Sequence, residues 1–568
     1  MSNASSPRRS AGRSAAVLLA AACVVSASLP AVAQDKPAAA DPAPKWGVFL
    51  DLEGKVGTKR SLGEADLFVP LLQDERTMLF GDVRFRFDDQ SSYEGNFGLG
   101  VRRMLEGGWN VGTYGYYDRR RSPNANFFNQ LTFGAEMLGT NFDLRANSYW
   151  PIGTTQQQVG SAVTGPSTAT VLVGGGLEVF TPATMANIEY AMQGFDAEAG
   201  VRIPITPAES PYNLRFYAGG FRFDTPTGAT PVVAGPRLRL EFTDYAVPGL
   251  WGGTRFTVGA EWQTDDVRGS QFFAGLRLRV PLQAEPRRAS FTMQERRMTD
   301  PIVRDVDIVS QVQAVQLAPA VTELATQTVN GQTITGITSA NTTGAALPGA
   351  ITAAGTNSFV VLAGTFNTTT TTSMPGGQTL IGGGPIALRT ASGRVVTANL
   401  AGATIAGTNV SPSALQLNSN ATVVGLTVSN AYSGGTGGSA AIMAGGAGNL
   451  TIVNNTFIAT QSGTNGALAL SSGGANANTL ISGNTLMVTG SGTATTMSAL
   501  GLGNAASTYT VFGNMISASG GTTNNAVLFT GGNPTILSGS TGNVRGSGNC
   551  SGSTTNGTIF FTNGTTCP

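Results

Sequence analysis

The fold of this chain is decided by the stretch Gly269-Ser270-Gln271-Phe272-Phe273-Ala274-Gly275-Leu276-Arg277-Leu278-Arg279-Val280-Pro281-Leu282. Apolar side chains occupy every even position from 272 to 282, and the odd positions include Gln271, Arg277 and Arg279. Successive side chains of a β-strand point to opposite faces, so this stretch predicts a strand with one apolar and one charged face. Such a strand, about ten residues long, is typical of a β-barrel that crosses an outer membrane.

The same alternation recurs along residues 46–282 and predicts an all-β fold with an antiparallel transmembrane barrel. We expect about twelve strands, at residues 46–57, 66–72, 77–87, 95–103, 109–117, 127–137, 142–150, 195–203, 214–223, 237–243, 255–263 and 271–282. The number is even and the barrel is expected to close, because lipid cannot satisfy an open sheet edge. Residues 109–117 carry aromatic side chains on both faces, so the register of this strand stays open.

The connections fit a barrel whose N-terminus lies in the periplasm. Residues 105–108 and 139–141 are short inner turns, whereas residues 151–193 form a long outer loop, as bacterial barrels arrange them. Residues 170–192 contain apolar runs of their own, so an added hairpin and fourteen strands are the alternative. A soluble β-sandwich also alternates, but its core would have to bury Arg and Glu on nearly every strand, which favours the barrel.

Composition and charge exclude some classes of function. The chain has 568 residues, enough for more than one domain, a formal net charge of +1 and no His. Binding to nucleic acid needs a concentrated basic surface, so no nucleic-acid partner is expected. No apolar run reaches the roughly 18–20 residues of a transmembrane helix, so a membrane would have to be crossed by strands.

The N-terminus predicts export from the cytoplasm. Residues 1–33 contain a basic region, an apolar region and a small-x-small ending, so we expect a signal peptide cleaved between Ala33 and Gln34. A lipoprotein signal at Cys23 is the alternative, but the three alanines before it lack the usual large aliphatic residue. Residues 34–45 are rich in Ala and Pro and are interpreted as a short leader.

Several short motifs resemble, in the same order, the inverse autotransporter β-domain of intimins and invasins. They are Phe68-Val69-Pro70-Leu71, Leu79-Phe80-Gly81-Asp82-Val83-Arg84, Gly95-Asn96-Phe97-Gly98-Leu99-Gly100-Val101-Arg102-Arg103, Tyr114-Gly115-Tyr116-Tyr117-Asp118, Gly134-Ala135-Glu136, Ala146-Asn147-Ser148-Tyr149-Trp150-Pro151 and Gly194-Phe195-Asp196-Ala197-Glu198. The resemblance covers roughly residues 46–310. It implies a twelve-stranded outer-membrane barrel that secretes its own C-terminal passenger by type V secretion, with barrel assembly machinery and periplasmic chaperones as partners. Unlike intimin, this chain lacks a peptidoglycan-binding LysM module and a row of immunoglobulin-like domains, so receptor binding of the intimin kind is not implied.

Residues 283–328 follow the last strand and are expected to link the barrel to the passenger. A short helix is expected just before Pro301, followed by an extended stretch that contains Arg304, Asp305 and Asp307. The resemblance implies that this stretch runs back through the pore, where a polar interior would supply partners for these three side chains. An ordinary interdomain linker is the alternative.

The composition changes in residues 329–568, the expected passenger. Glu323 is the last acidic residue, and Gly, Ser, Thr, Asn and Ala dominate after it. Disorder is one interpretation, but apolar runs recur about 30 residues apart, which is typical of repeats. One series is Val424–Val428, Val453–Ile458, Ile481–Met487 and Val511–Ile516, and a second starts at Ala414, Ala441, Ala467, Ala499 and Ala526.

Two strand series per repeat, with Gly and Asn at the turns, predict a parallel β-helix in which Asn side chains stack in ladders. The passenger resembles the right-handed β-helices of pectate-lyase-like proteins and many secreted adhesins. A β-helix needs a cap on its last rung. Once Cys23 leaves with the signal, Cys550 and Cys567 are the only cysteines, and they are expected to form a disulfide that holds such a cap.

Catalysis is not expected. Cleavage of polysaccharides needs paired carboxylates or acid-bound calcium, yet no carboxylate side chain follows Glu323 and the chain has no His. The same absences leave no catalytic residue, no metal site and no cofactor to predict. The favoured hypothesis is an inverse autotransporter that displays an adhesin-like β-helix for an unknown carbohydrate or protein ligand. The alternatives are an outer-membrane channel with a periplasmic extension and a carbohydrate-active enzyme.

Overall fold

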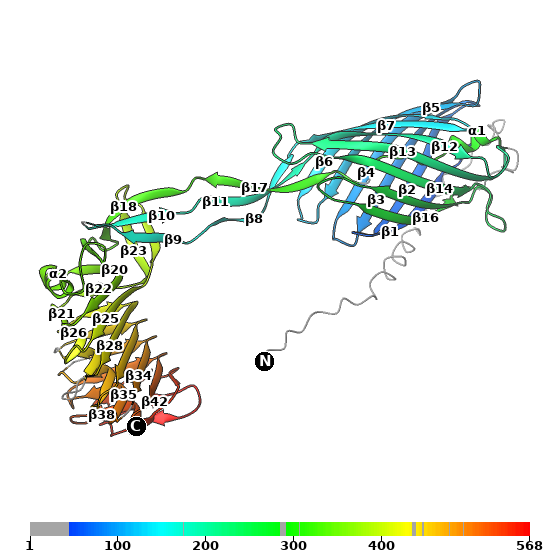
Figure 1. Ribbon diagram of the computed structural model, residues 1–568. Helices are drawn as coiled ribbons and strands as arrows, with labels where there is room; N and C mark the ends of the chain where they lie inside the picture. The colour runs from blue at the N-terminus through cyan, green and yellow to red at the C-terminus, as the bar shows by residue number, and fades with distance from the viewer. Residues whose placement is uncertain are drawn as a thin grey trace, which may run out of the picture. The chain divides into compact units, whose positions relative to one another are not determined.

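The computed structural model divides the chain into two compact units (Figure 1). It describes residues 45–173, 175–283, 291–305, 307–433, 439–445, 448–475, 478–491 and 493–568. The expected signal peptide, its cleavage site at Ala33 and Gln34, and the leader up to residue 44 lie outside these residues. The first unit extends to Ala162 and includes Met185–Val315, and the second contains Val163–Thr184 and Gln316–Pro568.

The first unit is a closed antiparallel barrel of twelve strands, which confirms the expected fold class and strand number. The strands are β1 (Phe49–Gly57), β2 (Leu62–Gln73), β3 (Thr77–Asp88), β4 (Tyr93–Met104), β5 (Asn110–Arg121), β6 (Phe127–Leu138), β7 (Phe142–Ile152), β12 (Gln193–Ile203), β13 (Tyr212–Asp224), β14 (Val233–Asp244), β15 (Arg255–Gln263) and β16 (Gln271–Pro281). Each pairs with its neighbour in the chain, and β7 pairs with β12 across the long loop. The barrel closes where β1 pairs with β16, with Phe49 opposite Pro281.

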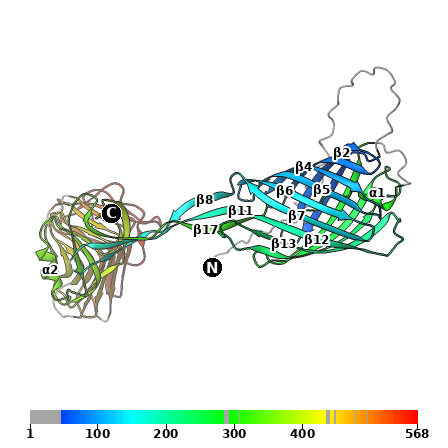
Figure 2. The ribbon, with the colours of Figure 1, turned by 90° about the horizontal axis from the view of Figure 1, so that it is seen from above.

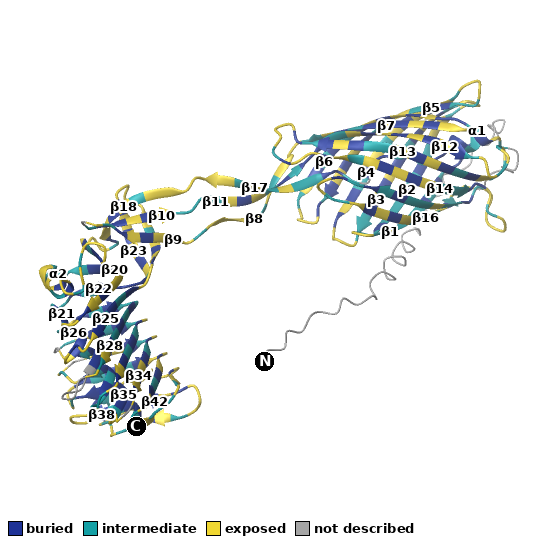
Figure 3. Ribbon diagram, in the orientation of Figure 1, coloured by how far each residue is buried: buried dark blue, intermediate teal, exposed yellow. Residues whose placement is uncertain are grey.

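Burial in the barrel is the reverse of that in a soluble protein, because its apolar face points outward. In β16, Phe272, Leu276 and Leu278 are exposed, while Gln271 and Arg279 are buried. Figure 3 shows the same alternation of buried and exposed residues on the other barrel strands. In β5, Tyr114 and Tyr116 are buried and Tyr117 is exposed, which settles the register that the aromatic sequence left open.

The long connection between β7 and β12 contains four strands of its own, and none of them enters the barrel. They are β8 (Gln156–Thr164), β9 (Ser167–Val171), β10 (Leu177–Thr181) and β11 (Thr184–Ala191). β8 and β11 form a three-stranded sheet with β17 (Ser310–Ala318). β9 and β10 belong to the second unit, so the structure departs here from the expected barrel range of 46–282.

The second unit begins with a small closed barrel in the order β10-β18-β23-β24-β9. β18 (Val321–Thr328), β23 (Gly384–Thr390) and β24 (Val395–Leu400) come from the C-terminal part of the chain. β18 therefore belongs to this unit, although residues 283–328 were expected to be linker. A short helix, α2 (Leu347–Ala353), follows β19 (Ile334–Thr338), which pairs in parallel with β20 (Phe359–Thr368).

The rest of the second unit is a stack of parallel strands, which confirms the β-helix. One series is β22 (Thr379–Ile381), β27 (Thr422–Val424), β30 (Leu450–Val453), β33 (Thr479–Ser482), β36 (Thr508–Phe512) and β39 (Thr535–Ile536). The second is β25 (Ala403–Thr408), β28 (Leu426–Tyr432), β31 (Thr456–Gln461), β34 (Thr485–Gly490), β37 (Met515–Ser519) and β40 (Val544–Arg545). The third is β21 (Thr372–Met374), β26 (Ser413–Leu417), β29 (Ser439–Ala444), β32 (Ala467–Ser472), β35 (Thr496–Gly503), β38 (Thr523–Thr530) and β41 (Asn549–Ser551).

Each turn of the β-helix therefore has three strands rather than the two expected. The apolar run Val424–Val428 contains a corner at Gly425, whose φ of 64° is left-handed. Asn454, Gly483 and Gly513 occupy the same corner in the next turns, with φ between 55° and 66°. Glycine and asparagine adopt this conformation at low cost, so a single residue splits one apolar run into two strands.

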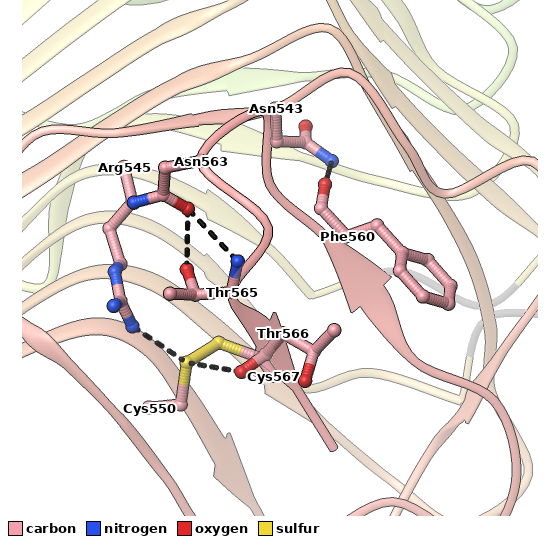
Figure 4. The surroundings of a disulfide bond; sticks show 8 residues. All are labelled: Asn543, Arg545, Cys550, Phe560, Asn563, Thr565, Thr566 and Cys567. Carbon is pink, nitrogen blue, oxygen red and sulfur yellow. Dashed lines mark hydrogen bonds between the residues drawn. A yellow bond between two sulfur atoms is a disulfide. The ribbon is translucent and has the colours of Figure 1, made fainter.

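The last rung is covered by a hairpin of β42 (Ile559–Phe560) and β43 (Thr566–Cys567). Cys550 and Cys567 are bonded, with their Cα atoms 5.5 Å apart (Figure 4). Ile559, Phe561 and Cys567 are buried in the same apolar cluster that runs through the β-helix. Among the described residues, no helix has the length and apolar character needed to span a membrane.

Candidate functional site: the polar interior of the barrel

The interior wall of the barrel carries charged side chains that pair with one another across neighbouring strands. Arg279 and Asp51 approach to 2.7 Å, and Arg145 and Glu198 to 3.0 Å. Removing a charged side chain from water costs on the order of several kcal/mol unless an opposite charge compensates it. The pairing therefore explains how so many Arg, Asp and Glu side chains line the inside of the barrel.

One end of this interior is covered by the short helix α1 (Met293–Arg297), which matches the helix expected before Pro301. Thr292 and Glu295 form a capping box at its N-terminus, which satisfies free N–H groups there. The indole N–H of Trp46 donates to the carbonyl oxygen of Glu295 at 3.0 Å, and the amide of Gln294 donates to the carbonyl oxygen of Leu105 at 2.9 Å. The helix is thus tied to the start of β1 and to the β4–β5 turn.

Glu295 also forms an ion pair with Lys45, 2.8 Å away. Burial by itself raises the pKa of Glu295, but the hydrogen bond from Lys45 and those from Thr292 outweigh it, so the pKa of this carboxyl lies below its usual range. The ion pair is therefore present at neutral pH and adds a further contact between α1 and the residue before β1.

Arg297, at the C-terminal end of α1, points into the barrel and binds Asp143 through two nitrogens, at 2.6 and 2.8 Å. It also bonds to Asp300 at 2.8 Å, and Asp300 lies 3.2 Å from Arg255 of the wall. Arg102 donates to the carbonyl oxygens of Met298 and Asp300. The backbone just after the helix is therefore held by side chains of the barrel.

In the middle of the segment, Arg304 lies against the interior wall. Its guanidinium lies 3.0 Å from Asp118 and 4.6 Å from the ring centre of Tyr116. Asp305 contacts the wall through its backbone, whose N–H donates to the hydroxyl of Tyr149 at 2.6 Å. Asn147 donates to the carbonyl oxygen of Val303 at 3.1 Å.

The far end of the segment is fixed by Asp307. Its carboxylate lies 2.5 Å from Arg60, 3.4 Å from Arg120 and 3.8 Å from Arg86. The N–H of Ile308 donates to Glu94 at 2.9 Å. Three arginines around one carboxylate make this the most strongly charged contact of the segment.

The segment leaves the barrel at the end opposite α1, as Figures 1 and 2 show. There the N–H of Met192 donates to the carbonyl oxygen of Val309 at 2.8 Å, and the hydroxyl of Ser310 donates to Glu189 at 2.9 Å. We call residues 298–310 the lumen segment. A stretch of this length would span about 40 Å if it were fully extended, more than the roughly 30 Å of a bilayer core.

The interior beside the lumen segment is largely filled. A cavity of about 40 Å³ remains beside Arg215, Arg255 and Asp300. That volume holds one or a few water molecules, since one water needs about 10–15 Å³ on this measure. The sequence singled out Arg304, Asp305 and Asp307 for this interior but not Arg297, which the helical pattern alone did not distinguish from the half-buried Arg296.

The second unit offers a different kind of surface. A cleft of about 440 Å³ lies on its side, lined by Thr408, Asn409, Ala431, Tyr432, Ser433, Thr460, Gln461, Ser462, Thr489, Gly490 and Ser491. None of these side chains is charged. Among the described residues no group of three His, Cys, Asp or Glu side chains is placed to hold a metal ion.

Comparison with known proteins identifies the barrel. Residues 45–212 match the sequence model of the inverse autotransporter β-domain, and no curated protein matches the chain. Among solved structures, NanC porin is similar over 41% of this chain and 100% of its own, with 9% identity and a TM-score of 0.25. Outer membrane phospholipase A from Escherichia coli is similar over 42% and 93%, with 10% identity and a TM-score of 0.24. A chain from a study of in-meso crystallization of membrane proteins is similar over 47% and 100%, with 13% identity and a TM-score of 0.33. Residues 45–212 therefore belong to the inverse autotransporter β-domain family, and the closed barrel that they help to build is an outer-membrane barrel.

Proposed function

We propose that the barrel exports residues 316–568 through its own interior to the cell surface, where the β-helix is displayed for adhesion. The observation that carries this proposal is the lumen segment. It enters the barrel at the end that holds α1, contacts the wall at Met298, Arg304 and Asp307, and leaves at the other end. A chain that has passed through the barrel and stopped there would show this arrangement.

The charge distribution supplies a reason for the stop. Beyond Glu323 the chain has only three charged side chains, Arg389, Arg394 and Arg545, so an unfolded passenger offers the charged wall few ion-pair partners. The lumen segment and α1 are the opposite, because Arg297, Arg304 and Asp307 each find an opposite charge on the wall. The unfolded passenger would therefore bind the barrel wall weakly during export, whereas the lumen segment binds the wall through ion pairs.

Adhesion is the role that the passenger's surface supports. The cleft beside Tyr432 and Gln461 is uncharged and rich in hydroxyl and amide groups, which suits a carbohydrate or protein ligand more than an ionic one. The lack of carboxylates after Glu323 argues against the carbohydrate-active alternative. The filled interior argues against an open channel. Barrel assembly machinery and periplasmic chaperones are the partners proposed for delivery to the membrane.

Protease treatment of intact cells tests this function. One epitope tag is placed after Ala401, in an exposed turn of the second unit, and another after Gln34. We expect protease to remove only the Ala401 tag from intact cells and both tags once the outer membrane is permeabilised. An Ala401 tag that survives on intact cells would place the β-helix in the periplasm and favour a barrel with an internal extension.

A further inference from the structure

The inference concerns the hairpin β9–β10, which the chain makes between two barrel strands. By sequence it follows β7 and precedes β12, yet it lies in the same compact unit as the passenger. β10 pairs antiparallel with β18, with Leu177 opposite Ala325 and Thr181 opposite Val321. β9 pairs in parallel with β24, with Ala169 opposite Leu400.

This pairing completes the first layer of the passenger. β23 lies between β18 and β24 and pairs with both, so the outer edges of β18 and β24 are the two that the hairpin covers. Without the hairpin these edges would expose unpaired N–H and C=O groups. Open edges invite wrong pairing and aggregation, and the terminal rungs of a repeat protein need a cap.

The side chains of the hairpin also fill the core of this layer. Leu177 and Val179 are 0% exposed and belong to one apolar cluster with Leu388 of β23. The same cluster contains Val361 of β20 and Ile381 of β22, two stacked parallel strands at the start of the β-helix. The hairpin therefore supplies apolar surface against which the start of the β-helix packs.

Gly336 of β19 shows how closely the passenger approaches the hairpin. A Cβ atom at this position would lie 2.7 Å from Cγ1 of Val171 in β9. Such a contact forces the neighbouring side chain to move, so glycine allows the strand to lie against the hairpin.

Two of the passenger's few charged side chains are also used at this layer. Arg394 forms an ion pair of 2.7 Å with Glu323 in β18 and donates to the hydroxyl of Thr181 in β10 at 3.0 Å. The guanidinium thus joins the hairpin, β18 and the β23–β24 turn. Arg394 and Glu323 therefore add charged, directional contacts to the pairing between the hairpin and the passenger.

We propose that the hairpin β9–β10 has a function of its own: it caps the N-terminal end of the β-helix and is the template on which the passenger's first strands pair. The hairpin belongs to a loop of the barrel, so it is in place before residues 321–400 arrive. A partner strand that is already folded removes part of the entropy cost of starting a sheet between distant segments. The templating step rests on the proposed export, whereas the capping contact does not.

The test compares two substitutions on the same strand of the full-length protein in outer membranes. Val179→Asp places a charge in the apolar cluster, and Phe180→Asp is the matched control because Phe180 is 44% exposed. Both variants carry the Ala401 tag. We measure tag access on intact cells, the protease resistance of the passenger, and barrel folding by the shift in gel migration on heating.

We expect Val179→Asp to leave the barrel folded and the tag accessible, but to raise the rate of passenger digestion at least ~10-fold over Phe180→Asp, a ratio equivalent to about 1.4 kcal/mol. Equal digestion of the two variants would overturn the cap. If the wild-type tag is inaccessible on intact cells, the export proposal fails, and the digestion comparison is made after permeabilisation.

A second variant keeps the proposal testable if Val179→Asp fails to reach the membrane. Phe180→Cys and Thr322→Cys lie opposite each other on β10 and β18, and both positions are exposed. With a protease site inserted after Ala320, we expect a short thiol crosslinker to hold the cut passenger covalently to the barrel. The control pair Phe180→Cys and Phe512→Cys should not be crosslinked. Crosslinking of neither pair, or of both equally, would overturn the assigned contact.

Discussion

Arg297 and Asp143 form a two-point ion pair inside the barrel, with N–O distances of 2.6 and 2.8 Å and both side chains at most 2% exposed. The pair joins α1, which follows the last barrel strand, to β7, the seventh of the twelve barrel strands. Two parallel N–H···O bonds fix orientation as well as distance, so Arg297 sets the position at which the chain turns into the interior.

Replacing Arg297 with Gln leaves the buried carboxylate of Asp143 without its closest partner. Breaking one side of a buried pair costs about 3–5 kcal/mol, so we expect the free energy of unfolding of the barrel to fall by about that amount. Urea denaturation in phospholipid vesicles measures it. The matched control is Arg222→Gln, because Arg222 and Asp224 are 50% and 35% exposed and such pairs contribute about 0–1 kcal/mol. An equal loss in both variants would show that the interior pair does not hold the segment.

Asp307 forms ion pairs with Arg60, Arg86 and Arg120, and among the described residues it is the only carboxylate that pairs with all three. Asp307→Asn removes the carboxylate that the three arginines share, although Arg60 keeps Asp88 and Arg86 keeps Glu64, so this end of the lumen segment gains net positive charge. We expect the segment to loosen and the barrel to conduct ions with a preference for anions, measured in planar bilayers. The control is Asp266→Asn, at an exposed loop position. Conductance as low as that of the wild type would mean that other contacts close the barrel by themselves.

The sequence could predict the barrel because its signal is local. In β16 the alternation of Phe272, Leu276 and Leu278 with Arg277 and Arg279 already states which face meets lipid. The lumen segment was partly predictable, since Arg304 and Asp307 must find partners once they enter a barrel. Arg297 was not, because its partner Asp143 is 154 residues away and no periodicity relates them.

The passenger shows the same limit. A spacing of about 30 residues predicts a repeat, but the corner at Gly425 lies within an unbroken apolar run, so two strands were interpreted as one. The hairpin β9–β10 carries the alternation of an ordinary strand pair, and only the pairing of Leu177 with Ala325 reveals that its partner is the passenger. Long-range pairing of this kind leaves no pattern within either segment.

A ladder of buried asparagines runs along one corner of the β-helix through Asn455, Asn484, Asn514 and Asn543. The amide of Asn484 donates to Asn514 at 3.0 Å, and the side-chain oxygen of Asn484 accepts from the amide of Asn455 at 3.0 Å. Asn484→Ala breaks both bonds and leaves buried polar groups unpaired, each at a cost of about 1–3 kcal/mol. We expect a drop of at least that size in the unfolding free energy of the passenger, measured by chemical denaturation.

Asn449→Ala is the control for the ladder, because the Asn449 side chain is exposed and its bond from Asn478 is long, at 3.4 Å. Water replaces an exposed bond at little cost, so this variant should change stability by less than about 0.5 kcal/mol. Similar losses in the two variants would mean that the buried ladder contributes no more than a surface contact.

The stability of the layer that contains the hairpin should depend on pH through Glu323. The hydrogen bond from Ser392, with the charge of Arg394, holds the pKa of Glu323 below its usual range. In the unfolded chain this carboxyl has a pKa of about 4.3. Its contribution to stability is therefore fully present above that pH and is lost as the pH falls through its lower pKa in the folded state. We expect passenger stability to decline on acidification below about pH 4.3. Glu323→Gln should flatten this decline, whereas Glu178→Gln, on the exposed face of β10, should leave it unchanged. A decline of the same size in Glu323→Gln would assign the acid sensitivity to another titrating group and not to this ion pair.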